Sequence, residues 1–147
     1  MRIAHLSIMA LTAVAVFAAG TSAILAQPRG QERPPLYPLS GQDQEAANGS
    51  GCQLSFNAGP RTYVYVIGHD FMIKTSTGRA VCHINDEEFA ALSDGGVQSC
   101  QGLRLTIRET GQSVAHEASD SASAPATLTV TGRGRPWTVS GQWGSAC

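Results

Sequence analysis

Four cysteines limit what this 147-residue chain can fold into, because they are even in number and widely spaced. They are Cys52, Cys82, Cys100 and Cys147, and the last of them is also the final residue. Zinc sites built from four cysteines usually take their ligands in close pairs such as C-x-x-C, and no such pair occurs here. The spacing therefore predicts two disulfides and argues against a bound metal.

The first 26 residues have the layout of a secretory signal peptide. A short positive start at Arg2 is followed by an apolar run over 6–19, and small residues lead up to Ala26. The run is shorter than the roughly 20 residues of a membrane-spanning helix, so we expect cleavage after Ala26, with Ala23 as second choice. An uncleaved N-terminal anchor is the alternative. The mature chain is expected to be periplasmic or secreted, without a membrane span.

The charge of the mature chain argues against nucleic acid as a partner. Cleavage after Ala26 removes Arg2 from the ten Lys and Arg residues, which leaves nine against eleven Asp and Glu, a net charge of −2. A nearly neutral surface does not attract a polyanion over a broad area, although a local basic patch can still do so.

Composition divides the mature chain into a tether and a domain. Residues 27–50 contain four of the seven prolines and almost no apolar periodicity, which predicts a flexible Pro/Gly-rich tether. The folded domain is expected to span residues 51–147. A domain of this size buries roughly 60–70% of the surface of its unfolded chain, so disulfides would add needed stability.

Alternating apolar and polar residues predict that the domain is mainly β. In 103–108, apolar residues at every second position alternate with Arg and Thr, and 126–131 repeats the pattern. The other expected strands are 53–57, 62–67, 71–75, 79–84 and 136–143. About seven short strands separated by glycine-containing turns predict a small antiparallel sandwich or barrel.

One segment, residues 85–94, has the pattern of a short helix. Asn85 is a suitable N-cap, Glu88 follows three residues later as in a capping box, and acidic residues fill the first turn. Phe89 and Leu92 share one face, and Gly95 ends the segment. A helix this short is marginal in water, so that face must pack on the sheet.

Strand parity predicts how the cysteines pair. Cys147 shares its side of the last strand with Trp137 and Val139, and Cys52 shares the apolar side of the first strand with Leu54. The start of one antiparallel strand lies beside the end of its partner, which predicts a Cys52–Cys147 disulfide on the inner face. Cys82 and Cys100 then form the second disulfide, which closes the base of the helical excursion.

Two groups of residues are candidates for a contact surface. In 61–67, Arg61, Tyr63 and Tyr65 form an outward stripe if the intervening valines point inward, and Met72 and Lys74 would extend it. The alternative is that the tyrosine side is buried as well. Arg133 and Arg135 on an expected hairpin tip form the second group, which would suit an anionic surface or a glycan phosphate. The alternative for these arginines is a soluble turn.

The histidines are the only residues whose neighbours suggest chemistry. His69 precedes Asp70, which could orient it as a general base, and His83 lies near Asp86 and Glu87, a set that can bind a divalent metal. Turn formation is the simpler explanation of the first group, and the charge preference of a helix start is the better explanation of the acids of the second.

Two further catalytic patterns fail. His116-Glu117 lacks the second histidine of H-E-x-x-H and lies in a polar segment expected to be a loop. If all four cysteines are paired, no thiol is available as a nucleophile. We therefore expect no catalytic residue, no bound metal and no cofactor.

These features predict an exported, non-catalytic binding or inhibitor-like domain whose partner is a protein or glycan of the cell envelope. In outline it resembles the small exported barrels that inhibit lysozymes, but no motif of that family is present. One alternative is a structural or assembly component of the envelope that uses an open sheet edge. Another is a small metal-dependent hydrolase using His69 and His83, which requires their side chains to converge in a pocket.

Overall fold

The computed structural model describes residues 33–147, so the predicted signal peptide and the first part of the predicted tether lie outside the described residues. The helices are α1 (Gly41–Glu45), α2 (Asp86–Leu92) and the short 3₁₀ helix η1 (Glu117–Ser119). The strands are β1 (Gln53–Ala58), β2 (Arg61–Ile67), β3 (Asp70–Thr75), β4 (Gly78–His83), β5 (Gly95–Cys100), β6 (Leu103–Glu109), β7 (Val114–His116), β8 (Ser121–Thr131) and β9 (Trp137–Ala146). None of the helices among these residues is long and apolar enough to cross a membrane.

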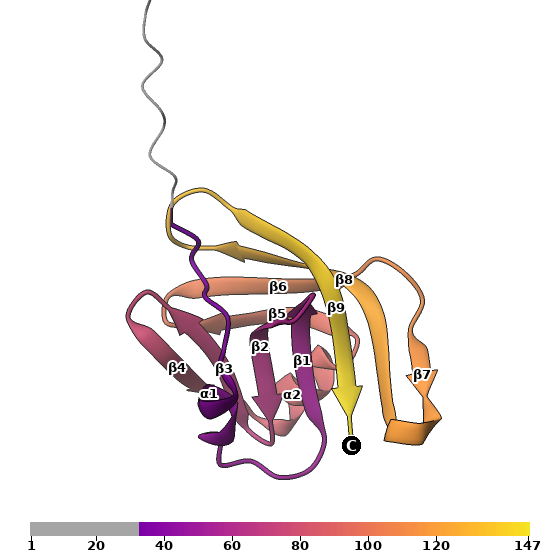
Figure 1. The fold of residues 1–147 in the computed structure, drawn as a ribbon. Coiled ribbons are helices and arrows are strands. Elements are labelled where there is room, and N and C mark those ends of the chain that lie inside the picture. The colour runs from indigo at the N-terminus through magenta and orange to yellow at the C-terminus, as the bar shows by residue number, and fades with distance from the viewer. Residues whose placement is uncertain (1–32) are drawn as a thin grey trace, which may run out of the picture. The chain divides into compact units, whose positions relative to one another are not determined.

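The strands form one antiparallel sheet in the order β4-β3-β2-β1-β9-β8-β6-β5, with β7 added to the start of β8. The sheet curls into a nearly closed barrel (Figure 1), and the Cys82–Cys100 disulfide joins the two strands at the ends of this order. The predicted mainly β sandwich or barrel with one short helix at 85–94 is confirmed.

Both predicted disulfides are present, Cys52–Cys147 and Cys82–Cys100. β1 and β9 are neighbours, and Gln53 lies opposite Ala146, so the terminal disulfide continues their ladder by one residue. The pairing is confirmed but the expected inner position is wrong: Cys52 and Cys147 lie one residue beyond the ends of β1 and β9 and are exposed, so this disulfide is at the rim of the barrel and outside its core.

Two strands, β5 and β7, were not expected from the sequence. β5 begins with Gly95 and Gly96, which obscure any apolar alternation. A side chain at either position would collide with backbone, at Ile107 from Gly95 and at Ala91 of α2 from Gly96. The glycines therefore let β6 and α2 approach β5 closely. β7 lies in the segment predicted to be a loop, and all three of its residues are exposed.

A β-bulge turns Tyr63 into the core. Phe56 pairs with Val64 and Asn57 pairs with Thr62, so Tyr63 has no residue opposite it. Tyr63 and Val64 are consequently both buried, and the Tyr63 ring packs 5.5 Å from the ring of Trp137. The prediction of an outward tyrosine stripe is therefore wrong for Tyr63.

Part of the predicted tether packs against the barrel. Leu36 is fully buried in the core, the N–H of Tyr37 donates to Lys74 O (2.8 Å), and the N–H of Leu39 donates to Thr62 O (2.8 Å). The described part of 27–50 thus belongs to the compact unit that spans Arg33–Cys147. The burial of two leucines among the prolines offsets the entropy of ordering the segment.

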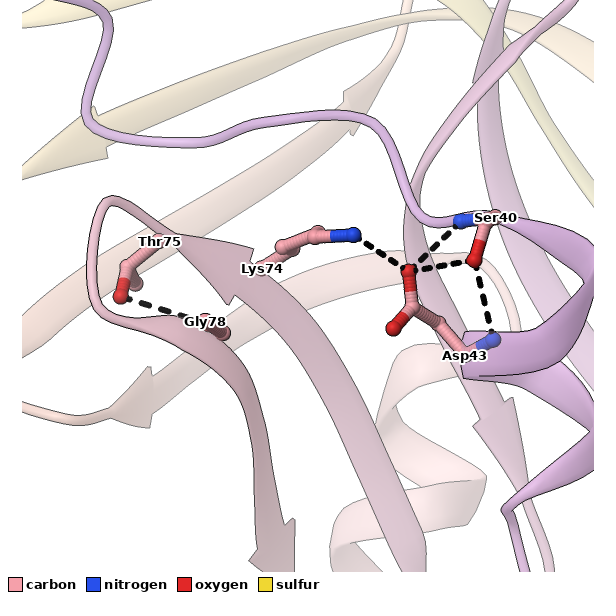
Figure 2. Close-up of polar contacts among 5 residues, drawn as sticks. All are labelled: Ser40, Asp43, Lys74, Thr75 and Gly78. Atoms are coloured by element: carbon pink, nitrogen blue, oxygen red, sulfur yellow. Dashed lines mark hydrogen bonds and ion pairs between the residues drawn. The ribbon is translucent and has the colours of Figure 1, made fainter.

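The α1 segment is fastened by a network around one carboxylate (Figure 2). Asp43 Oδ2 accepts from Lys74 Nζ (2.7 Å) and from both the N–H and the Oγ of Ser40 (2.8 Å each), while Ser40 Oγ caps the Asp43 N–H. These contacts hold the pKa of Asp43 down at about 2, with the Lys74 hydrogen bond as the largest cause. Lys74 is therefore engaged within the chain and does not extend an outward contact stripe.

The predicted helix has the expected caps. Asn85 accepts from the Glu88 N–H (2.8 Å), and Glu88 in turn accepts from the Asn85 N–H (2.9 Å). At the other end, the buried Trp143 donates from Nε1 to Leu92 O (2.9 Å). This bond ties the last turn of α2 to β9.

Candidate functional site

The pairing of the strands places the connecting segments at two opposite ends of the barrel, and these ends carry different charges. The turns at 59–60, 76–77, 101–102 and 132–136 lie at one end, which we call the hairpin end. The turn between β2 and β3, the helix α2 and the segment from β7 to η1 lie at the other, which we call the helix end. In Figure 1 the β8–β9 hairpin is at the upper left and α2 is near the bottom.

Five arginines gather at the hairpin end, and all five are exposed. They stand next to its turns or within them: Arg61, Arg79, Arg104, Arg133 and Arg135. Within residues 33–147 none of the five takes part in a salt bridge. In the described part of the chain, their one side-chain hydrogen bond is from Arg133 Nη2 to Gln101 O (3.1 Å), which joins two neighbouring turns.

Acidic residues dominate the helix end. Eight of the ten acidic residues among 33–147 lie there: Asp70, Asp86, Glu87, Glu88, Asp94, Glu109, Glu117 and Asp120. Asp43, which lies elsewhere, is paired with Lys74. Arg108 lies near the end of β6 that reaches the helix end, so it differs from the five arginines of the hairpin end. The barrel therefore has a basic end and an acidic end despite its small net charge.

The residues predicted to form a contact surface differ in their exposure to solvent. Arg61, Arg133 and Arg135 are exposed at the hairpin end. Tyr63 is buried, and Tyr65 is half-buried, with its hydroxyl donating to Gln53 Oε1 (2.6 Å). Burial raises the pKa of Tyr65. Met72, which would have extended the stripe, is fully buried. The exposed surface is thus arginine-rich and lacks the tyrosine stripe.

At the helix end, two histidines and two aspartates meet. His69 Nε2 lies 2.8 Å from Asp86 Oδ1, and His83 Nδ1 lies 3.8 Å from Asp70 Oδ1. The two imidazole rings are 5.3 Å apart, edge to face. They border a hollow of about 470 Å³ that is also lined by residues 48–50. His69 and His83 therefore lie close together, as the hydrolase alternative requires. The carboxylate in contact with His69 is that of Asp86, and Glu87 makes no ion pair with either histidine.

Other chemical groups of the described chain lie apart from this cluster. His116 is exposed on β7, where its Nε2 contacts Ser123 Oγ (3.3 Å). All four cysteines are in disulfides. No three His, Cys, Asp or Glu side chains among residues 33–147 are grouped closely enough to form a ready-made metal site.

The sequence signal for the histidine cluster was partial. The Asp70–His83 pairing across β3 and β4 depends on the register of two strands, and the approach of Asp86 depends on the placement of α2. Neither follows from spacing along the chain. The arginine end was visible only at Arg61 and at the β8–β9 hairpin, because Arg79 and Arg104 join it through the sheet order.

Comparison with known proteins provides no family for this chain. No protein-family model matches the sequence, and no curated protein or solved structure is significantly similar to it.

Proposed function

We propose that this chain is an exported, non-catalytic binding domain that holds an anionic protein or glycan of the cell envelope through its arginine end. The observation that carries the proposal is the set of five exposed arginines without an ion-pair partner in residues 33–147. Guanidinium groups bind phosphate and carboxylate with two parallel hydrogen bonds, and they remain charged at any physiological pH.

The shape of the hairpin end supports binding to a surface. The turns at 101–102 and 132–136 are joined by the Arg133 bond and by the close approach of Gly132 to Gly102, so Arg104, which follows the first turn, is held near the arginines of the second. The acidic helix end would orient the molecule, because an anionic partner attracts one end and repels the other.

The two disulfides support a location in the cell envelope, because such bonds persist in oxidising compartments.

The edge strand β5 offers a weaker contact for envelope assembly. α2 packs against its first residues, and the Cys82–Cys100 disulfide ties its end to β4, so only its middle is open.

Charge reversal tests the proposal in a cosedimentation assay with an envelope preparation from the producing host. We expect Arg135→Glu to weaken retention about tenfold, equivalent to 1.4 kcal/mol. Arg108→Glu is the matched control, since it makes the same charge change on an exposed arginine toward the other end. Salt at about 1 M, which shortens the screening length to about 3 Å, should release the wild type.

Protease treatment of the preparation separates a protein partner from a glycan. The proposal fails if wild-type protein is not retained at low salt, if Arg135→Glu is retained like wild type, or if Arg108→Glu loses as much. Because Arg135 is exposed on a turn, its replacement should not change the thermal unfolding of the protein.

A further inference from the structure

We propose that His69 and His83 together bind a divalent transition-metal ion, with Cu²⁺ preferred. The site lies at the helix end, away from the five arginines, and it does not rest on the envelope-binding proposal. Its basis is the placement of two imidazoles side by side at the rim of a hollow, each next to its own carboxylate.

The fold holds the two histidines on connected backbone. His83 is the last residue of β4 and pairs with Asp70, the residue after His69. The next residue, Ile84, donates its N–H to His69 O (2.9 Å). With ring centres 5.3 Å apart, a nitrogen of each imidazole can reach one ion through metal–nitrogen bonds of about 2.0–2.1 Å.

His69 also has the partner that a metal-binding histidine normally has. Such a histidine uses one ring nitrogen for the metal and donates from the other to a carboxylate or carbonyl. Asp86 lies at Nε2 of His69, which leaves Nδ1 for a metal. Asp70 Oδ1 lies 3.8 Å from Nδ1 of His83, which is longer than a hydrogen bond, so it places a negative charge beside that ring without fixing its orientation. The backbone N–H of Asn48 bonds Asp70 Oδ2 (3.3 Å) and steadies that carboxylate.

The donor set selects the class of ion. Neutral imidazole suits copper, nickel and zinc, and divalent copper has the highest affinity in this series, whereas calcium and magnesium prefer oxygen ligands. Two imidazoles leave the other coordination positions to water or to a group from another molecule. The hollow of about 470 Å³ beside the rings has room for both.

Titration of the purified oxidised protein with Cu²⁺ at pH 7.5 tests the site, by calorimetry and by NMR of the histidine rings. We expect one equivalent to bind and to broaden the ring signals of His69 and His83 before those of His116. His69→Ala and His83→Ala should each abolish this event. Asp86→Asn, which keeps both imidazoles, should weaken it roughly 10–100-fold.

His116→Ala is the control, because it removes an exposed histidine outside the cluster. The proposal is overturned if the wild type binds no Cu²⁺ equivalent at these rings, or if His116→Ala weakens binding as much as His83→Ala does. It is also overturned if Ca²⁺ or Mg²⁺ displaces Cu²⁺. His69 and His83 are exposed, so unchanged thermal unfolding of both variants shows that the loss is local.

Discussion

Trp143 connects the terminal strand β9 to both the core and the helix α2. Its ring is 1% exposed, it lies opposite Phe56 across β1 and β9, and its Nε1 reaches the last carbonyl of α2. A tryptophan is suited to this position because it fills the core while its N–H satisfies a buried acceptor. The helix, too short to be stable alone, is thereby bonded to the terminal strand.

Replacing Trp143 with Phe should therefore destabilise the protein by about 1–3 kcal/mol, since Leu92 O loses its donor and a void remains beside the smaller ring. Urea unfolding measures the change, and hydrogen exchange at α2 amides should accelerate more than at β2. Gln142→Ala, at the exposed neighbouring position, serves as control. Wild-type stability in Trp143→Phe would contradict this account.

At the scale of elements, the segment that carries α1 is held to the barrel largely through Asp43. The contact is partly buried, with 14% of the Asp43 side chain and 32% of the Lys74 side chain exposed. The pKa of Asp43 is lowered from 3.8 to about 2 in the folded protein. Its contribution to the free energy of unfolding is thus complete above about pH 4 and is lost as the pH falls toward 2.

Asp43→Asn should lower the free energy of unfolding by about 1–2 kcal/mol at pH 7, after allowance for solvent screening of a partly exposed pair. The difference from wild type should shrink between pH 4 and 2, because the Asp43 carboxylate is progressively protonated as the pH falls toward its folded pKa of about 2. Denaturant titrations at several pH values provide the measurement. Glu45→Gln, in the same helix, is the control; an equal loss there, or a difference that persists at pH 2, would refute the interpretation.

At the scale of the whole molecule, the two disulfides close loops of different length. Cys52–Cys147 spans 95 residues and joins the first and last strands, whereas Cys82–Cys100 spans 18 and joins the two ends of the sheet order. In the loop-entropy model the longer loop stabilises by about 5 kcal/mol and the shorter one by about 3 kcal/mol.

Paired replacement by serine tests this ranking without leaving a lone thiol. Cys52→Ser with Cys147→Ser should lower the melting temperature more than Cys82→Ser with Cys100→Ser, as measured by calorimetry. The exposed position of Cys52 and Cys147 means that the longer pair can be replaced without opening a cavity. A melting temperature unaffected by the terminal pair would show that the β1–β9 ladder alone holds the chain ends.

Some elements could be predicted because their information is local. The alternation in β6 and the capping box of α2 each lie within a few residues, and both are confirmed. The disulfide pairing was also predictable, since strand parity needs only the side on which each cysteine stands. The bulge at Tyr63 was not, because it depends on how β2 aligns with β1.

By itself, the sequence determined a small, disulfide-linked β domain and the position of its helix, because strand alternation and helix capping depend on residues that are close together in the chain. Only the tertiary structure decided which charged groups share a surface. The order of strands brings Arg79 and Arg104 to the same end as Arg133, and the register of β3 with β4 brings His83 beside His69. Such neighbours come from distant parts of the chain, and burial of the core selects the registers that bring them together.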